Sequence, residues 1–309
     1  MVKKNLINLS QIVKDDEVVE KPHIDKQPKK AKKIAKPVKD LADGKSFRLI
    51  SKIEPQKRRG RYNVFINDQF AFGVDEEVLL RFELKKGLHI TTELQKKIEN
   101  EESFYKAYSR VLNYLSYSLR TEKQICDYLA KHELSHFEDR IIEKLKAVKL
   151  IDDLIYAESY VRTMANVNQK GTRNIIQDLK MRGVSENEIL DALEEYPEEQ
   201  QLENAIQLAE KKWAKTKKSS TFDSIQKTKQ YLVNKGYSFE IADQAIEAID
   251  TDKDEDEEYE GLEKQAEKAL KRYSRKYKGY ELSQRLRAFL YSKGYANELI
   301  NRYVDERDL

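Results

Sequence analysis

The sequence predicts a mainly α-helical protein in which tandem three-helix repeats form an elongated curved array, preceded by a small β-rich domain and a disordered basic tail. Three observations predict this fold. Helix breakers are scarce beyond residue 45, apolar residues follow a helical period from residue 92 onward, and one short motif recurs four times. Because 37% of the residues are charged and 39% are hydrophobic, we expect thin cores within stacked repeats rather than one large core.

The first 45 residues carry 12 Lys against seven acidic residues and three of the five prolines. This composition predicts a disordered basic tail, which either contacts nucleic acid weakly or serves as a solubilising extension. The first 13 residues lack the continuous apolar core of a signal peptide, and no apolar run approaches the roughly 20 residues that span a bilayer. We therefore expect a cytoplasmic protein with no membrane partner.

Residues 46–91 alternate between apolar and other side chains with the period of a β-strand. The runs on either side of Asn67-Asp68 predict a hairpin, since both residues tolerate the positive φ of a tight turn. A further strand at 49–53 completes a small three-stranded sheet, and Asp75 is expected to open a short helix.

From Thr92 onward the apolar period becomes helical, with predicted capping boxes at Thr92/Gln95 and Thr121/Gln124. A motif of the form Leu-x-x-basic-Gly-apolar-Ser then recurs, with its leucines at 129, 179, 232 and 290. Its glycines are expected to take the left-handed conformation that ends a helix, although the first copy has His132 and Glu133 at the basic and glycine positions. The glycines are Gly183, Gly236 and Gly294.

Each repeat is predicted to hold three helices of about 50 residues in total. The motif serines at 135 and 185 have Glu three residues later, which predicts a capping box at the start of each third helix. Small residues upstream, at Ala107, Ala157, Ala209 and Ala269, predict close packing of the first helix. The expected repeats are 92–150, 151–197, 198–250 and 261–309, with an acidic linker at 251–260 that holds eight acidic residues and one Lys when counted from Asp250.

Basic residues gather near the loop between the first two strands and near the junctions of first and second helices. They predict binding to DNA phosphates or to an acidic partner, and the alternative is an ordinary solvated helix face. Trp213, Tyr273 and Tyr277 lie among these clusters and either stack on bases or pack into the core. The candidate binding residues are Arg58, Arg59, Arg61, Lys170, Arg173, Lys212, Lys215, Lys217, Lys218, Arg272, Arg275 and Lys276.

No catalytic, cofactor or metal constellation is predicted. His132 and His136 are separated by the helix-closing motif, and Asp152-Asp153 stands where a helix needs an N-cap. Cys126, the only cysteine, lies in an apolar stripe and is expected in the core. A Gly-rich phosphate loop is also missing, so we expect a protein that is not an enzyme.

Several of these features together resemble the RecX family, which is built of tandem three-helix repeats. The resemblance includes Arg120-Thr121-Glu122 before a second helix, Leu150-Ile151-Asp152-Asp153 followed by Tyr156-Ala157, and the β-rich stretch Phe70-Ala71-Phe72-Gly73 of Gram-positive members. It covers about residues 46–309. The sequence departs from the family in its tail, in its acidic insertion and in the weakened glycine position of the first repeat.

The resemblance implies a monomeric regulator that lies along the groove of the RecA–DNA filament. Such a protein would block strand exchange and repressor co-cleavage and limit filament growth, and so regulate recombination, DNA repair and the SOS response. Single-stranded DNA would be a partner directly or through the filament. Two alternatives stay open: a helical-repeat binder of single-stranded DNA or RNA with no recombinase partner, and a scaffold for some other protein.

Overall fold

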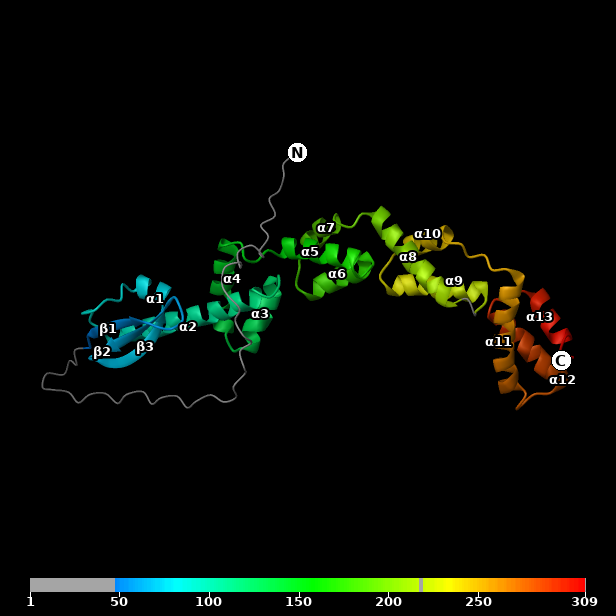
Figure 1. Ribbon diagram of the computed structural model, residues 1–309, viewed down its shortest axis with the longest axis horizontal. Coiled ribbons are helices and arrows are strands. Elements are labelled where there is room, and N and C mark those ends of the chain that lie inside the picture. Colours follow the sequence, from blue (N-terminus) through cyan, green and yellow to red (C-terminus); the bar gives the residue numbers. More distant parts are fainter. Residues whose placement is uncertain (1–47, 217–218, 309) are drawn as a thin grey trace, which may run out of the picture. The chain divides into compact units, whose positions relative to one another are not determined.

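The computed structural model describes residues 48–216 and 219–308, so the predicted tail at 1–45 lies outside the described residues. Within these residues the chain forms three strands and thirteen helices, as Figure 1 shows. The mainly helical class, the N-terminal antiparallel sheet and the tandem three-helix units are as predicted. None of the described helices is long and apolar enough to cross a membrane.

The N-terminal sheet has strand order β1-β2-β3, with both neighbouring pairs antiparallel. Asn67 and Asp68 form the turn between β2 and β3 with φ of 50° and 60°, as expected. The strands are β1 (Ile50–Pro55), β2 (Arg61–Ile66) and β3 (Gln69–Asp75). Asp75 caps the short helix α1 (Glu76–Arg81) by accepting the Glu77 N–H, as predicted.

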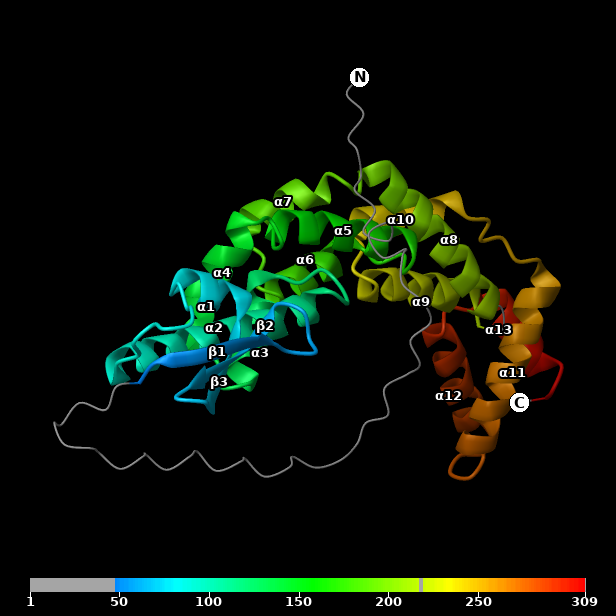
Figure 2. The same cartoon turned by 60° about the vertical axis from the view of Figure 1, so that its left-hand side comes forward.

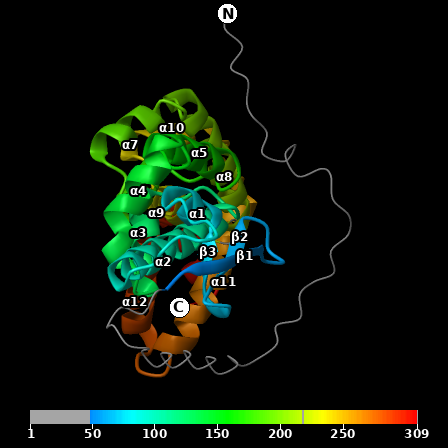
Figure 3. The same ribbon diagram turned by 90° about the vertical axis from the view of Figure 1, so that its left-hand side faces the viewer.

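The long helix α2 (Thr92–Leu115) contacts the sheet and α1, and Figure 3 shows the strands and these helices from their own end of the chain. Buried Glu102 of α2 accepts hydrogen bonds from the Arg61 guanidinium (2.5 Å) and from the Asp75 N–H (2.7 Å). The predicted capping box at Thr92 is wrong. Thr91 has the extended backbone of an N-cap and accepts the Leu94 N–H, so Thr92 is the first helical residue.

Helices α2 to α13 form four consecutive units of three, which we call units 1 to 4 and which can be followed in Figures 1 and 2. In every unit the motif leucine and the predicted small residue of the first helix are buried. Unit 1 adds α3 (Glu122–Lys131) and α4 (Glu138–Ala147) to α2; unit 2 holds α5 (Asp153–Asn166), α6 (Thr172–Met181) and α7 (Glu186–Leu193); unit 3 holds α8 (Glu198–Thr216), α9 (Thr221–Asn234) and α10 (Phe239–Ala248); unit 4 holds α11 (Glu255–Tyr273), α12 (Gly279–Ser292) and α13 (Asn297–Asp305).

Most of the predicted helix caps and glycine conformations of the motif are present. Capping boxes form at Thr121/Gln124 and at Ser185/Glu188, and the motif glycines have positive φ. The predicted box at Ser135/Glu138 is wrong, because Ser135 starts a short 3-10 helix and α4 begins only at Glu138, without a side-chain cap. The acidic residues 255–260 belong to α11, so the acidic segment is largely helical rather than a connector.

Neighbouring units meet through the second helices, end to end. In units 1 to 3, the N-terminus of the second helix donates hydrogen bonds to backbone carbonyls at the motif end of the next second helix. Thr121 Oγ1 donates to the Arg182 carbonyl (2.7 Å), and the Gly171 N–H donates to the Lys235 carbonyl (2.9 Å). Ser220 Oγ likewise donates to the Lys293 carbonyl. Free N–H groups and hydroxyls at one helix start thus satisfy free carbonyls at another helix end.

This arrangement gives the motif glycine a second requirement besides its positive φ. A Cβ at Gly183 would lie 2.5 Å from Lys123 Cβ, and one at Gly236 would lie 2.8 Å from the Asn174 backbone nitrogen. A Cβ at Gly294 would lie 2.5 Å from Phe222 Cβ. Unit 1 carries Glu133 at this position with φ of 62°, and its side chain is exposed because no preceding unit packs there.

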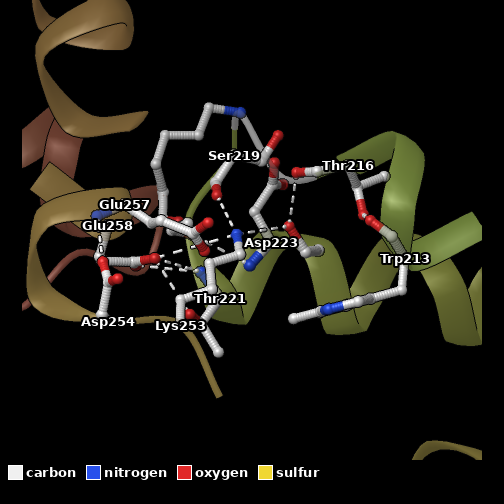
Figure 4. A network of polar contacts seen from close by, with 12 residues as sticks. Trp213, Thr216, Ser219, Thr221, Asp223, Lys253, Asp254, Glu257 and Glu258 are labelled. Carbon is white, nitrogen blue, oxygen red and sulfur yellow. Dashed lines mark hydrogen bonds and ion pairs between the residues drawn. The ribbon is translucent and has the colours of Figure 1, made fainter. Parts of the chain in front are cut away.

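Lys253 strengthens the junction of units 3 and 4, as Figure 4 shows. Its side chain is only 2% exposed, although it lies within the acidic segment between α10 and α11. The ammonium group donates to the Ser219 carbonyl (2.6 Å) and lies 5.2 Å from the centre of the Trp213 ring. Glu258 completes the network by accepting the Thr221 N–H at the start of α9. Ser219 and Thr221 are therefore held by Lys253, from the segment before α11, and by Glu258 of unit 4.

Candidate functional site

The arginines of the β1–β2 loop line one side of a hollow of about 680 Å³ beside α2. Arg58 and Arg59 are exposed, whereas Arg61 is half-buried in its ion pair with Glu102. Of the three predicted residues, only Arg58 and Arg59 are therefore free to meet a ligand.

Two further cations, Lys106 and Arg110, reach the same hollow from α2. They lie four residues apart on one face of the helix, but nothing in their local sequence indicates that this face meets the arginine loop. Asp75, Glu76 and Glu77 line the hollow as well, so its cationic character is only partial.

The two predicted cations at the start of α6 have different surroundings. Lys170 forms an ion pair with Asp178 and is half-buried. Arg173 is exposed, and its N–H donates to the Gly236 carbonyl across the junction of units 2 and 3 (3.0 Å). Arg173 is therefore the available charge of this cluster, and Lys170 is neutralised within the protein.

Two of the predicted lysines of α8 are described, and one of them is exposed while the other is half-buried. Lys215 is exposed, and the ammonium group of Lys212 lies 5.5 Å from the centre of the Tyr231 ring. Lys235, which is not among the predicted residues, approaches the same ring at 5.8 Å. Lys217 and Lys218 lie outside the described residues.

Unit 4 repeats this arrangement. Arg272 is exposed and lies 4.5 Å from the Tyr273 ring centre and 5.5 Å from that of Phe289. Lys293 approaches the Phe289 ring at 5.9 Å. Arg275 and Lys276, in the segment after α11, are both exposed.

The fold brings the Lys170/Arg173 and Lys212 clusters toward one another. The Gly171 N–H donates to the carbonyl of Lys235, whose side chain shares the Tyr231 ring with Lys212. The Arg58 to Arg61 cluster, in contrast, faces α2 of unit 1. A signal for Tyr231 and Lys235 existed in the sequence: both belong to the third motif copy, where an aromatic residue precedes the leucine and a lysine fills the basic position.

The aromatic residues near the clusters pack rather than project. Trp213 is 8% exposed and belongs to the core of unit 3, beneath Lys253. Tyr273 and Tyr277 are half-buried, and the Tyr277 ring is covered by the Arg285 guanidinium at 4.0 Å. Trp213 would have to leave the core in order to stack on a base. Of the two alternatives, packing into the core is therefore the one that the structure supports for Trp213.

The residues that resembled catalytic groups have structural contacts. Asp152 caps α5 by accepting the Ile155 N–H, and Asp153 accepts the Glu122 N–H across the first junction (2.9 Å). Burial raises the pKa of the Cys126 thiol to about 12, and a hydrogen bond to Glu138 adds to the shift. Within residues 48–216 and 219–308, no group of three His, Cys, Asp or Glu side chains is placed to hold a metal ion.

Comparison with known families accounts for almost all of the described chain. The model of the regulatory protein RecX N-terminal domain matches residues 48–91, and those of the first and second RecX three-helix domains match 107–145 and 152–193. The model of the third three-helix domain matches twice, at 198–246 and 255–304. The chain belongs to the RecX family.

Individual relatives agree with this assignment. Regulatory protein RecX of Leuconostoc mesenteroides is 40% identical over 85% of this chain and 98% of its own length. The corresponding values are 36%, 84% and 98% for Oceanobacillus iheyensis, and 35%, 84% and 99% for Bacillus subtilis. A crystal structure of regulatory protein RecX is 40% identical, with a TM-score of 0.61, and covers 65% of this chain and 99% of its own.

The segments that carried the resemblance meet in the structure. Thr121 and Glu122 of the Arg-Thr-Glu segment contact Arg182 and Asp153, respectively. These RecX features thus join units 1 and 2.

Proposed function

We propose that this protein regulates RecA by binding the RecA–DNA filament, mostly inhibiting recombinase, ATPase and co-protease activity and so regulating DNA repair and recombination. The observation that carries the proposal is RecX family membership across the sheet domain and all four units. Exposed cations on the sheet domain and on units 2 and 3, such as Arg58, Arg173 and Lys215, support contact with a polyanionic filament. The protein acts in this proposal as a cytoplasmic monomer without catalytic activity of its own.

The test uses pre-assembled filaments of the cognate RecA on single-stranded DNA with ATP. Addition of the full chain should lower the rate of ATP hydrolysis and block strand exchange at amounts near or below the RecA concentration. Unchanged rates at equimolar protein would contradict the proposal.

A second candidate is a single-stranded nucleic-acid binder with no recombinase partner, which the cation–aromatic contacts around Tyr231 and Phe289 favour. To separate the two, RecA is added either to DNA that the protein already covers or to naked DNA. The rate of ATP hydrolysis is then compared between the two samples. An effect only through DNA occupancy would be overcome by excess DNA, whereas direct inhibition of the filament would persist.

A further inference from the structure

In each unit the motif end of the second helix meets the first helix. Equivalent residues of the four units can be compared at this contact. Three positions define it: three residues after the small alanine of the first helix, one residue before the motif leucine, and the basic position of the motif. In unit 3 these are Lys212, Tyr231 and Lys235; in unit 4 they are Arg272, Phe289 and Lys293.

In units 3 and 4 two cations share one aromatic ring. Lys212 and Lys235 lie 5.5 and 5.8 Å from the Tyr231 ring centre, and Arg272 and Lys293 lie 5.5 and 5.9 Å from that of Phe289. None of these four cations forms an ion pair within the part of the chain that the structure describes. Asp223 interacts electrostatically with Lys293 without an ion pair between them, and its carboxylate is paired with Lys227.

Unit 2 carries an anion at the place of the aromatic ring. The equivalent residues are Tyr160, Asp178 and Arg182, and Asp178 accepts a hydrogen bond from the Tyr160 hydroxyl (2.6 Å) and pairs with Lys170. Burial would raise the pKa of Asp178, but the hydrogen bonds from Lys170 and Tyr160 outweigh it and hold the pKa below its ordinary value. Unit 2 thus supplies a carboxylate to its own cations.

Unit 1 covers the ring instead. Tyr128 stacks on Tyr114 with ring centres 4.4 Å apart, and His132 at the basic position lies at the same distance from Tyr128. Unit 1 thus has an imidazole where units 3 and 4 have a lysine side chain. Among the described residues at this place, only units 3 and 4 hold two Lys or Arg side chains against one ring without an internal carboxylate.

We propose that the paired cations of units 3 and 4 are two equivalent phosphate sites, each of which takes a phosphodiester group of a single nucleic-acid strand. The ring holds the two charges near each other, and a phosphate oxygen supplies the anion that Asp178 supplies in unit 2. Because the family model of the third domain matches both units, the two sites occur on repeats of the same type. This inference rests on the proposed function, since it names the DNA-contacting units of the same regulator.

The first test removes one site. The double variant Lys212→Gln, Lys235→Gln keeps most of each side-chain stem and removes two charges. Lys229→Gln, Lys264→Gln is the control with the same charge change, because both of these lysines already have carboxylate partners. Affinity for a fluorescein-labelled oligothymidylate is measured by anisotropy over a range of salt concentrations, with the folded state of each full-length variant checked by circular dichroism.

The site variant should bind about tenfold more weakly than the control at low salt, and its slope of log affinity against log salt should fall by about 0.7 per lost phosphate contact. An affinity and slope equal to those of the control would overturn the proposal. If the double variant unfolds, each single Gln variant is measured by the same criterion.

The second test removes the internal carboxylate of unit 2. Asp178→Asn removes the ion pair of Lys170 and the negative charge that acts on Arg182, and Asp243→Asn frees Lys229 with the same change in net charge. We expect Asp178→Asn to bind the oligonucleotide severalfold more tightly than Asp243→Asn, with a steeper salt dependence. Equal affinities would contradict the role of Asp178 as the internal counterpart of phosphate. Neither test contains recombinase, so its result is separate from that of the filament assay.

Discussion

Single residues set both the shape of a helix end and the contact between two units. Gly236 has φ of 98°, and its missing side chain makes room for the Asn174 backbone. Gly87 has φ of 88°, but apart from Gly87 itself and its two chain neighbours no described heavy atom lies within 4 Å of the place where a Cβ would lie. A substitution at Gly87 thus tests backbone strain alone, whereas one at Gly236 tests backbone strain together with a collision at the junction of two units.

We expect Gly87→Ala to lower the free energy of unfolding by about 1–2 kcal/mol, the cost of a left-handed conformation in an L-residue. Gly236→Ala should lower it by a further ~1–3 kcal/mol, because the new methyl group collides with the neighbouring unit. Urea unfolding of the two variants measures both values. Equal losses would mean that the junction adapts and does not depend on the absent side chain.

The single cysteine gives a second prediction at this scale. Since burial raises the pKa of Cys126 to about 12, very little thiolate is present at neutral pH, and thiolate is the reactive form. A thiol-specific reagent should react slowly with the folded protein and rapidly with the same protein in denaturant. Reaction at the rate of a free thiol before unfolding would contradict this environment.

Ion pairs to one buried carboxylate connect separate helices of the N-terminal region. Glu101 of α2 pairs with Arg81 of α1 and Arg140 of α4, and its side chain is 9% exposed. The hydrogen bond from Arg140 holds the pKa of Glu101 below its ordinary value, despite burial. Its stabilising effect is therefore complete above the unfolded-state pKa of a glutamate and is lost as the pH falls through the lower folded-state pKa.

We expect Glu101→Gln to reduce stability at neutral pH and to make the acid side of the stability curve flatter than in the unchanged protein. Thermal melts across the acid range check this, with Glu186→Gln as the control. The pKa of Glu186 is also lowered, by Lys180, but that pair is exposed and screened by solvent. If the stability of Glu101→Gln and of the unchanged protein fell equally steeply with decreasing pH, the link between Glu101 ionisation and stability would be refuted.

The helices and turns were largely predictable, because their signals are local. Asn67-Asp68, Thr121 with Gln124, and the motif glycines each fix a turn, a start or an end through the few residues around them. Thr91 and Thr92 could both cap α2, and only the backbone shows that Thr91 does. At Ser135 a 3-10 helix displaced the expected cap.

The candidate site was less predictable, since a charge becomes available or neutralised through distant partners. Lys170 and Lys212 looked alike in sequence, but one pairs with Asp178 and the other lies against Tyr231. Lys106 and Arg110 join Arg58 and Arg59 only through the packing of α2 beside the β1–β2 loop.

At the scale of the whole chain, each unit is stabilised by contact with its neighbour along the sequence. A change at one junction should therefore alter the two units that meet there and leave more distant units nearly unchanged. Gly294 lies at the junction of units 3 and 4, against Phe222 at the start of α9.

We expect Gly294→Ala to speed amide hydrogen exchange in α9 and in α11 to α13, while exchange in the sheet and unit 1 stays as in the unchanged protein. Hydrogen exchange with mass spectrometry of the full chain measures this region by region. Faster exchange throughout the chain would instead indicate one cooperative fold in which the junctions are not separate.

Glu133 sets a direction for the growth of this protein by gene duplication. A copied unit that carries the motif glycine can be inserted after any existing unit and meets its neighbours through the same helix-end contact, with no new surface to evolve. A unit placed ahead of the first would meet a glutamate side chain instead of a glycine. Lengthening is therefore open toward the C-terminus and closed toward the sheet domain, consistent with units 3 and 4 matching the same domain model.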